Sequence, residues 1–245
     1  MGTHLGDSWF LDVQARLARV RERNAAALRQ LGPQIGPVVA RGGIIHVFGS
    51  GHSEIIAREM VGRAGGLACI SQILDPTAGA AENVAGYGTL LAERHARIHG
   101  MDSGETVVVI SNSGRNAAPI EVALHARSRG LQVVAVTALA MSASSDYASR
   151  HASGHKLHEV ADVVLDNGGV PGDAVVSLPG GAGSTGPTST LTGAMLLNLL
   201  HLEVVQWLLD NGCEPPLLRS QNLDGSIERN RALGARYRTR LSRPL

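Results

Sequence analysis

The sequence predicts an α/β fold in which a parallel β-sheet lies between layers of helices. Short runs of β-branched and aliphatic residues alternate along the chain with longer amphipathic stretches, which is the pattern of repeated β-α-β units. Aromatic residues make up only 3% of the chain while 44% of it is hydrophobic, so the core must consist mainly of valine, leucine, isoleucine and alanine. Such a core is typical of a parallel sheet with helices on both faces.

The central part of the chain supplies the strands and helices of this sheet. Strands are expected at residues 43–48, 67–71, 106–110, 131–137 and 162–165. The helices between them are expected at residues 53–64, 88–98 and 117–129. A further short strand is expected at residues 174–178, within a stretch rich in glycine, proline and serine.

A long amphipathic helix is expected near the N-terminus, at residues 7–31. Apolar residues recur there every three or four positions opposite a strip of arginines and glutamates, which is the pattern of a surface helix. Four helix-breaking residues follow and are expected to end this helix: Gly32, Pro33, Gly36 and Pro37.

The rest of the chain contains two further helices and no linker. An apolar helix is expected at residues 188–209, and a final polar helix within residues 222–243. Because no repeat or linker-like segment interrupts the sequence, we expect a single domain over residues 1–245. Its core covers about residues 43–207, and residues 214–245 form a C-terminal extension.

Charge and hydropathy argue against several classes of protein. With 22 basic and 21 acidic residues the net charge is +1, which argues against a nucleic-acid-binding surface. The first residues show no basic region followed by an apolar run, so no export signal is expected. The apolar stretch 191–209 is interrupted by Asn198, His201, Glu203 and Gln206, which favours a buried or interface helix over a membrane span.

Cysteine usage is typical of a reducing compartment. Cys69 and Cys213 are the only cysteines, and their spacing fits neither a disulfide framework nor a metal site. Cys69 lies in the apolar segment LACIS, which is typical of a buried structural thiol. A cytoplasmic protein is therefore expected.

Two of the expected strands run directly into turns rich in serine and glycine. They are IIHVFGSGHSEIIAREM at residues 44–60 and VVVISNSGRN at residues 107–116. A strand, a hydroxyl-rich glycine turn and a helix in succession direct backbone N–H groups and serine hydroxyls at an anion. Because the carboxyl ends of parallel strands share one edge of the sheet, the pair of turns predicts one phosphate-bearing ligand held between two strand ends.

The candidate phosphate ligands are the donors of these turns and of the start of the apolar helix. They are Ser50, Gly51 and Ser53; Ser111, Asn112, Ser113, Gly114 and Arg115; and Thr188, Ser189 and Thr190. The alternative is that Ser53, Ser111 and Thr188 only cap helices. Capping explains one hydroxyl per helix and leaves the Ser-x-Ser-Gly pattern unexplained, which favours ligand binding.

Together these segments resemble the SIS (sugar isomerase) domain. GSGHS at 49–53 and SNSGRN at 111–116 resemble its two serine- and glycine-rich turns, and GPTSTLTGA at 186–194 resembles the start of its last helix. SRHASGHKL at 149–157 and EPPLLRSQNLDGSIERNRAL at 214–233 are similar to a bacterial group described as sugar isomerase domain or phosphosugar-binding proteins.

The resemblance implies a fold, a ligand class and an assembly. The expected fold is a three-layer sandwich of doubly wound, flavodoxin-like topology with a five-stranded parallel sheet. The expected ligand is a sugar phosphate, and the expected assembly is a homodimer or homotetramer. Members of the family are aldose–ketose isomerases, sugar-phosphate lyases or etherases, aminotransferase-linked isomerases or non-catalytic sensors, and the fold alone does not choose among them.

An isomerase of this family must move a proton between adjacent sugar carbons through an enediolate, which needs a base. Glu59, in SEIIAREMVGR, resembles the helix-borne glutamate of phosphoheptose isomerases and is the candidate base. The alternative for Glu59 is a solvated or arginine-paired carboxylate. Glu54 lies in the first helical turn, where it would complement the helix dipole. Glu82, in the loop TAGAAENVAGYG, is a third candidate that would be placed by loop closure.

The candidate acids that would open the sugar ring are His52 and His155. His52 lies inside the first turn, and His155 lies in the histidine-rich segment 149–158 together with Lys156. His201, on the apolar helix, is interpreted as a buried structural histidine that needs only one hydrogen-bond partner.

No metal site is expected. His151, His155 and His158 would share one face of a helix, but Gly154 weakens a helix there. The resemblance to phosphoheptose isomerases implies a zinc-binding histidine one turn before Glu59, and Ile55 stands at that position.

The leading hypothesis is a cytoplasmic aldose–ketose isomerase of sugar phosphates that needs no cofactor. The alternatives are a sugar-phosphate lyase or etherase, which also begins with proton abstraction, and a non-catalytic phosphosugar sensor. No DNA-binding helix pair or strongly basic segment is visible in the sequence, so no nucleic-acid partner is expected, and no membrane partner either.

Overall fold

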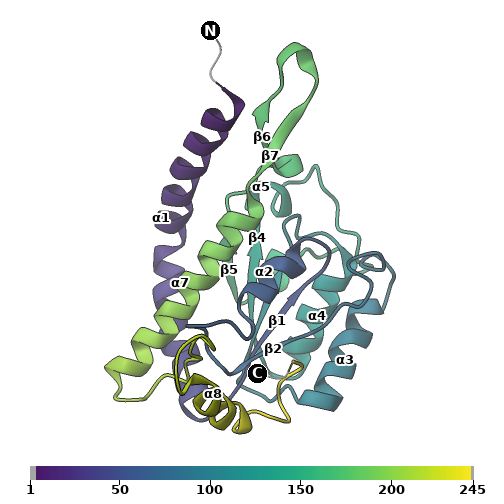
Figure 1. The fold of residues 1–245 in the computed structure, drawn as a ribbon. Coiled ribbons are helices and arrows are strands. Elements are labelled where there is room, and N and C mark those ends of the chain that lie inside the picture. The colour runs from purple at the N-terminus through teal and green to yellow at the C-terminus, as the bar shows by residue number, and fades with distance from the viewer. Residues whose placement is uncertain (1–3, 244–245) are drawn as a thin grey trace.

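Five parallel strands form the central sheet (Figure 1): β1 (Ile45–Gly49), β2 (Ile70–Gln72), β3 (Thr106–Ile110), β4 (Gln132–Thr137) and β5 (Val163–Asp166). Their order is β2-β1-β3-β4-β5. The chain therefore adds β2 on one side of β1 and the remaining strands on the other side. The computed structural model describes residues 4–243, and residues 1–3 and 244–245 of the expected domain lie outside it. The predicted α/β class and the five-stranded parallel sheet are confirmed.

The sheet is buried on both faces because each strand sends alternate side chains into two separate cores. In β1, Ile45 and Val47 enter one core and Phe48 enters the other. The runs of β-branched residues that predicted these strands therefore belong to strands covered on both sides. Cys69 is fully buried beside the first core, and burial raises the pKa of its thiol to about 12.

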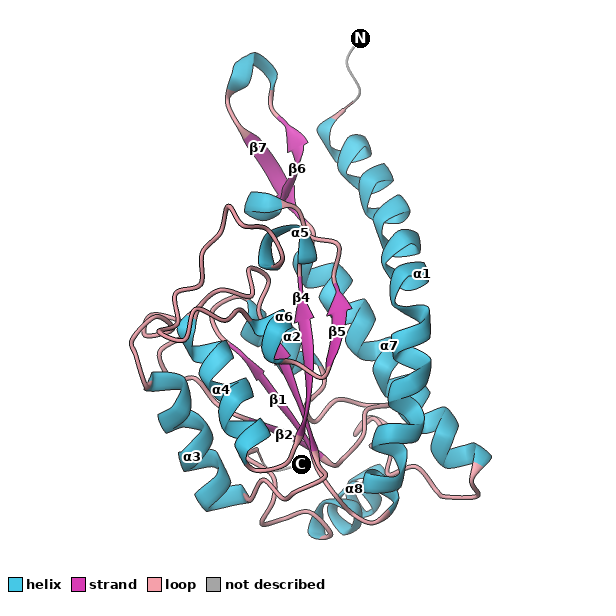
Figure 2. Cartoon of the chain, turned by 180° about the vertical axis from the view of Figure 1, so that it is seen from behind, coloured by secondary structure: helices cyan, strands magenta, loops and turns pink. Residues whose placement is uncertain are grey.

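Helices cover the two faces in two groups, which Figure 2 shows from behind. The first core is closed by α1 (Leu5–Ala40), α2 (Ser53–Glu59) and α7 (Ser189–Asp210). The second is closed by α3 (Tyr87–His99), α4 (Ala117–Ser128) and the short α6 (Leu157–Val160). A further short helix, α5 (Leu139–Ser142), follows β4 at the carboxyl edge of the sheet.

The expected end of the N-terminal helix at residue 31 is wrong. α1 continues through all four helix-breaking residues to Ala40, with two prolines inside it. A Cβ atom at Gly36 would lie 2.2 Å from the ring of Trp207, and one at Gly32 would lie 2.8 Å from the carbonyl oxygen of Glu203. The glycines therefore allow α7 to approach α1 closely, and burial against α7 outweighs the local cost of the prolines.

The helix expected at residues 53–64 is also shorter than its apolar pattern indicated. α2 ends at Glu59, and the chain turns through Gly62 and Gly65, whose φ angles are +66° and +78°. Positive φ angles are readily adopted by glycine, so these two residues turn the chain away from the helix axis beyond the end of α2. The shortening fixes Glu59 at the last turn of α2.

The C-terminal extension packs against the same body. Its helix α8 (Ser226–Ala235) is followed by a tail that runs along the edge strand β2. The N–H of Gln72 donates to the Oγ of Ser242 (3.0 Å), and the N–H of Ser242 donates to the Oγ of Ser71 (3.1 Å). The tail thereby covers an edge that would otherwise present unpaired backbone groups.

A β-hairpin projects beyond the carboxyl end of the sheet (Figures 1 and 2). It pairs β6 (Ala174–Ser177) with β7 (Ser184–Pro187), and short 3₁₀ turns lie at its base, η1 (Pro171–Asp173), and at its tip, η2 (Pro179–Gly181). The strand expected at residues 174–178 is therefore present, but in a separate two-stranded sheet.

The last long helix, α7, is long and apolar enough to span a membrane when only length and composition are considered. It lies along α1 (Figure 1) and buries Leu196, Leu200 and Val204 in the first core. This is the position of a core helix in a globular domain.

Candidate functional site

The two serine- and glycine-rich turns meet at the carboxyl edge of the sheet, after β1 and β3. Between them lies a hollow of about 770 Å³ that is open to solvent. Its lining is mostly hydroxyl, amide and carboxylate groups: Ser50, Gly51, His52, Ser53, Glu82, Ser111, Asn112, Ser113, Asn116, Met141, Gly172 and Asp173. The structure thus brings together in one hollow eight of the residues considered from the sequence, Glu82 among them.

The second turn is shaped by Gly114. Its φ angle is +64°, and a Cβ atom there would lie 2.7 Å from the Cβ of Ser142, so only glycine fits without displacing the chain. The N–H of Gly114 donates to the Oγ of Ser111 (3.2 Å), which fixes that hydroxyl within the turn. Gly114 itself lies behind the turn, while Ser111 and Ser113 line the hollow.

The second turn, just before α4, keeps backbone donors free. The N-terminal cap residues of α2, α4 and α7 are His52, Asn116 and Thr188, and none of them forms a capping hydrogen bond through its side chain. Within residues 4–243, no hydrogen bond uses the N–H groups of Ser113 or Arg115. Free N–H groups at the start of a helix form an anion site, because the helix dipole adds to their polarity.

Glu82 carries a carboxylate into this hollow. Its Oε2 accepts a hydrogen bond from the hydroxyl of Ser50 (2.6 Å), and its Oε1 accepts one from the side-chain amide of Asn116 (2.7 Å). Its backbone carbonyl accepts the N–H of Ala118 in the first turn of α4 (2.8 Å). Glu82 therefore links the two turns, although from the sequence it was only the third candidate base.

Asp173 holds the start of α7 beside the hollow. Its carboxylate accepts the N–H groups of Thr188 (3.2 Å) and Ser189 (3.0 Å) and the hydroxyl of Ser189 (2.5 Å). Three predicted phosphate ligands, Thr188, Ser189 and Thr190, consequently do not line the hollow. Asp173 has a φ angle of +55°, which is uncommon for a residue with a side chain.

Arg115 and His155, also predicted site residues, lie outside the lining of the hollow. The carbonyl oxygen of Arg115 accepts the N–H of Arg150 (2.8 Å), and its buried Nε has no partner among the described residues. His155 is exposed, and its carbonyl accepts the hydroxyl of Ser149 (2.6 Å). The segment 149–158 thus packs over the back of the second turn.

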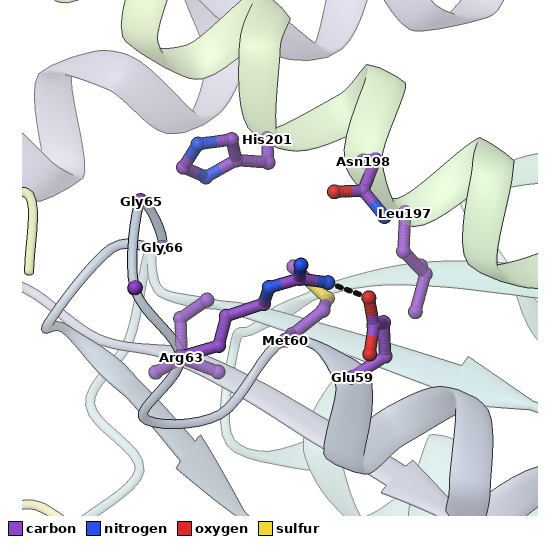
Figure 3. Close-up of a pocket in the computed structure, with 10 residues that line it drawn as sticks. Glu59, Met60, Arg63, Gly65, Gly66, Leu197, Asn198 and His201 are labelled. Carbon is purple, nitrogen blue, oxygen red and sulfur yellow. Dashed lines mark ion pairs between the residues drawn. The ribbon is translucent and has the colours of Figure 1, made fainter. Parts of the chain in front are cut away.

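Glu59 lines a different pocket, between the end of α2 and α7 (Figure 3). It forms an ion pair with Arg63, four residues further along the chain. His201 and Asn198 of α7 line the same pocket. Burial lowers the pKa of His201, which keeps its imidazole neutral over a wider range of pH. The structure therefore places Glu59 with His201 and away from Ser111 and Ser113.

The histidines show no metal-binding arrangement. Among residues 4–243, no three His, Cys, Asp or Glu side chains are grouped as metal ligands. His151 lies 3.9 Å from Glu121, while His52 is exposed at the rim of the hollow.

Sequence reasoning missed Met141, Gly172 and Asp173 as parts of the hollow. Met141 belongs to α5, a four-residue helix with no detectable periodicity, and the other two lie in the turn at the base of the hairpin. Their positions depend on how the hairpin folds back over the sheet. No local pattern in the sequence signals that placement.

Comparison with known proteins places the chain in a family. A model of the SIS domain matches residues 8–138. A UPF0309 protein of Listeria monocytogenes is 38% identical over 97% of this chain and 99% of its own, and one of Halalkalibacterium halodurans is 39% identical over 86% and 88%. The structure of a phosphoheptose isomerase from Francisella tularensis has the same fold, with a TM-score of 0.57 and 16% identity over 82% of this chain and 96% of that one. The chain therefore belongs to the SIS domain family and to the UPF0309 group of proteins.

Proposed function

We propose that this protein binds a sugar phosphate and interconverts its aldose and ketose forms through an enediolate. The observation that carries the proposal is the hollow at the ends of β1 and β3, where free N–H groups, two serine-rich turns and the carboxylate of Glu82 meet. Its membership of the SIS domain family and the phosphoheptose isomerase fold support this ligand class.

The phosphate would lie against the second turn and the start of α4. The hydroxyl and the N–H group of Ser113 are free to donate there. The lining contains no lysine or arginine, so the phosphate would be held by oriented dipoles rather than by a cation.

Two carboxylates are candidates for the base that moves the proton. Glu82 is already in the hollow, held by Ser50 and Asn116, and His52 stands at the rim, where it could protonate the ring oxygen. Glu59 follows Ser53 by six residues, about 9 Å along a helix at 1.5 Å per residue, and shares its pocket with the imidazole of His201. We propose Glu82 as the base, with Glu59 as the second candidate.

Binding is tested by thermal unfolding with a panel of sugar phosphates and with inorganic phosphate. A ligand that binds only the folded state raises the unfolding temperature by mass action. Ser113→Ala should weaken binding about ten- to a hundredfold, because a hydrogen bond to a charged group contributes about 1.5–3 kcal/mol. Ser128→Ala, at the far end of α4, is the control, since its hydroxyl only donates to the carbonyl of His125. Equal affinities of the two variants would contradict the proposed phosphate position.

Chemistry is tested by incubating the protein and each sugar phosphate in D₂O. Deuterium at a carbon next to the carbonyl, together with the isomeric sugar, is the expected result. Glu82→Gln should abolish exchange and keep the thermal shift. Loss of exchange in Glu59→Gln alone would assign the base to Glu59.

The same experiment separates the alternative functions. Exchange accompanied by release of a substituent from the sugar would identify a lyase or etherase. A thermal shift with no exchange across the panel would identify a sensor.

A further inference from the structure

The segment that carries Glu82 is a loop whose two ends are joined by one carboxylate. We call residues 75–87, which follow β2 and end at the first residue of α3, the Glu82 loop. At its start, Asp75 Oδ1 accepts hydrogen bonds from the N–H of Thr77 (2.9 Å) and from the hydroxyl of Thr77 (2.7 Å). The same oxygen accepts the hydroxyl of Tyr87 from the other end of the loop (2.7 Å). Tyr87 thus closes the base of the loop.

The middle of the loop lies directly on the first turn. The N–H of Gly79 donates to Asp75 Oδ2 (2.9 Å), and a Cβ atom at Gly79 would lie 2.7 Å from the backbone nitrogen of Gly51. A larger residue could not be accommodated there without moving one of the two segments. The loop therefore packs tightly against the first turn, and Asp75 at its base holds the residue that makes this contact.

The electrostatics favour the hydrogen bond between Tyr87 and Asp75 at neutral pH. Burial alone would raise the pKa of Asp75, but hydrogen bonds from Thr77, Tyr87 and Gly79 outweigh it and hold that pKa below its ordinary value. Burial and the neighbouring carboxylate raise the pKa of Tyr87, so its hydroxyl remains a donor. The bond joins a neutral donor to an ionised acceptor, which is the stronger kind.

We propose that Tyr87 is a positioning residue: its hydrogen bond to Asp75 closes the Glu82 loop and fixes the Glu82 carboxylate between Ser50 and Asn116. This inference rests on the proposed function, because it assumes that Glu82 acts on the bound sugar. The proposed phosphate donors on Ser113 form no hydrogen bond with the loop. Loss of this hydrogen bond between Tyr87 and Asp75, which we call the clasp, should therefore slow the chemical step and leave phosphate binding in place.

The test compares two tyrosine variants with the same chemical change. Tyr87→Phe removes the hydroxyl that bonds Asp75, whereas Tyr147→Phe removes a hydroxyl that forms no hydrogen bond within the described chain. Tyr87→Phe should lower kcat about tenfold at unchanged KM and leave the thermal shift by inorganic phosphate unchanged, since one lost hydrogen bond amounts to about 1.4 kcal/mol. Tyr147→Phe should match the wild type.

A second measurement does not depend on turnover. The amide of Ala118 donates to the carbonyl of Glu82, so its hydrogen exchange reports whether the loop is docked. In Tyr87→Phe the amides of Ala118 and Gly79 should exchange about tenfold faster, while the strand amide of Val108 should not change. Unchanged exchange at Ala118 and Gly79 would overturn the clasp.

The outcomes separate the two proposals. Faster exchange with unchanged kcat, or a higher KM with unchanged kcat, would overturn the positioning role of Tyr87. If the wild type shows no turnover but Tyr87→Phe exchanges faster, the isomerase proposal is refuted. The hydrogen bond between Tyr87 and Asp75 would then still hold the Glu82 loop in place. Faster exchange with lower kcat at constant KM would support both.

Discussion

At the scale of single residues, a buried polar network lies at the opposite end of the sheet from the hollow. His46 Nε2 bonds Glu105 Oε2 (3.0 Å), and His46 Nδ1 bonds His95 Nε2 (3.0 Å). Arg240 of the C-terminal tail donates to both oxygens of Glu105 (2.9 Å each). The Glu105 carboxylate can only accept, so His46 donates to it through Nε2, while the donor between His46 and His95 depends on the tautomer.

This network predicts that stability falls as the pH is lowered. Burial and the neighbouring His46, His99 and Arg240 lower the pKa of His95 from 6.5 to about 2. In the unfolded chain His95 takes up a proton near pH 6.5, while in the folded protein it stays neutral, so protonation favours unfolding. The contribution of His95 to the free energy of unfolding is complete above pH 6.5 and decreases as the pH falls towards 2. Its slope is at most about 1.4 kcal/mol per pH unit.

Glu105 adds to the same trend at lower pH. Burial alone would raise its pKa, but hydrogen bonds from His46 and from the N–H groups of Asp102 and Ile44 lower the pKa from 4.5 to about 2. Its contribution is complete above pH 4.5 and is lost as the pH falls towards 2.

The measurement is urea unfolding between pH 8 and pH 5 for the wild type and His95→Gln. Glutamine can donate to His46 without titrating, so the variant should lose part of the slope below pH 6.5. Comparison at pH 8, where imidazoles are neutral, isolates any loss of packing. Identical slopes in the two proteins would show that His95 does not carry the pH dependence.

The position of the hollow could be predicted from sequence, but the identity of its carboxylate could not. Ser50, Ser111 and Ser113 follow strands directly, so their location at the carboxyl edge is dictated by the parallel sheet. Glu82 follows no strand directly and reaches the hollow only because the Glu82 loop folds back over the first turn. Glu59 matches a family motif, yet its place depends on where α2 ends.

At the scale of elements, the packing of α1 against α7 depends on small residues. Gly36 faces the ring of Trp207, and an added methyl group would overlap it by more than an ordinary contact allows. Gly36→Ala should therefore destabilise the fold by about 1–3 kcal/mol, the usual cost of overpacking. Gly6→Ala, in the first turn of the same helix, should be neutral or stabilise by up to about 1 kcal/mol through helix propensity. Its Cβ atom would meet only its neighbour His4, at 3.4 Å.

Chemical denaturation of the two glycine variants distinguishes packing from propensity. If propensity alone governed α1, both substitutions would stabilise the protein, and that result would contradict the packing argument. Circular dichroism should show no loss of helix in either variant under native conditions.

Strand β3 was predicted more closely than the end of α1, for a physical reason. The burial of β3 on both faces requires the unbroken run of β-branched residues 106–110, which matches the strand observed at Thr106–Ile110. The end of α1 is decided by contact with α7, about 170 residues away in the chain (Gly36 with Trp207). Local breakers such as Pro33 therefore gave the wrong end, because tertiary packing overrides propensity.

At the scale of the whole molecule, α7 leaves an apolar stripe uncovered. Leu191, Leu202 and Leu209 are 44%, 57% and 57% exposed, and their spacing places them on one face of the helix. Polar Asn198 lies within the same stripe. Large apolar side chains aligned in this way are typical of a surface that another chain covers.

We expect this stripe to pair with its equivalent in a second copy, giving the homodimer expected from the sequence. Two copies related by a twofold axis would bury each stripe against the other, which is the usual form of a self-complementary interface. Leu202→Glu should shift the mass measured by light scattering at micromolar concentration from two chains towards one, because it places a charge at the centre of that interface. Leu223→Glu changes an equally exposed leucine, 61% accessible, outside α7 and should leave the mass unchanged. A wild-type mass of one chain would refute the dimer. Dissociation by both variants would show that the effect is not specific to α7 and would contradict this interface.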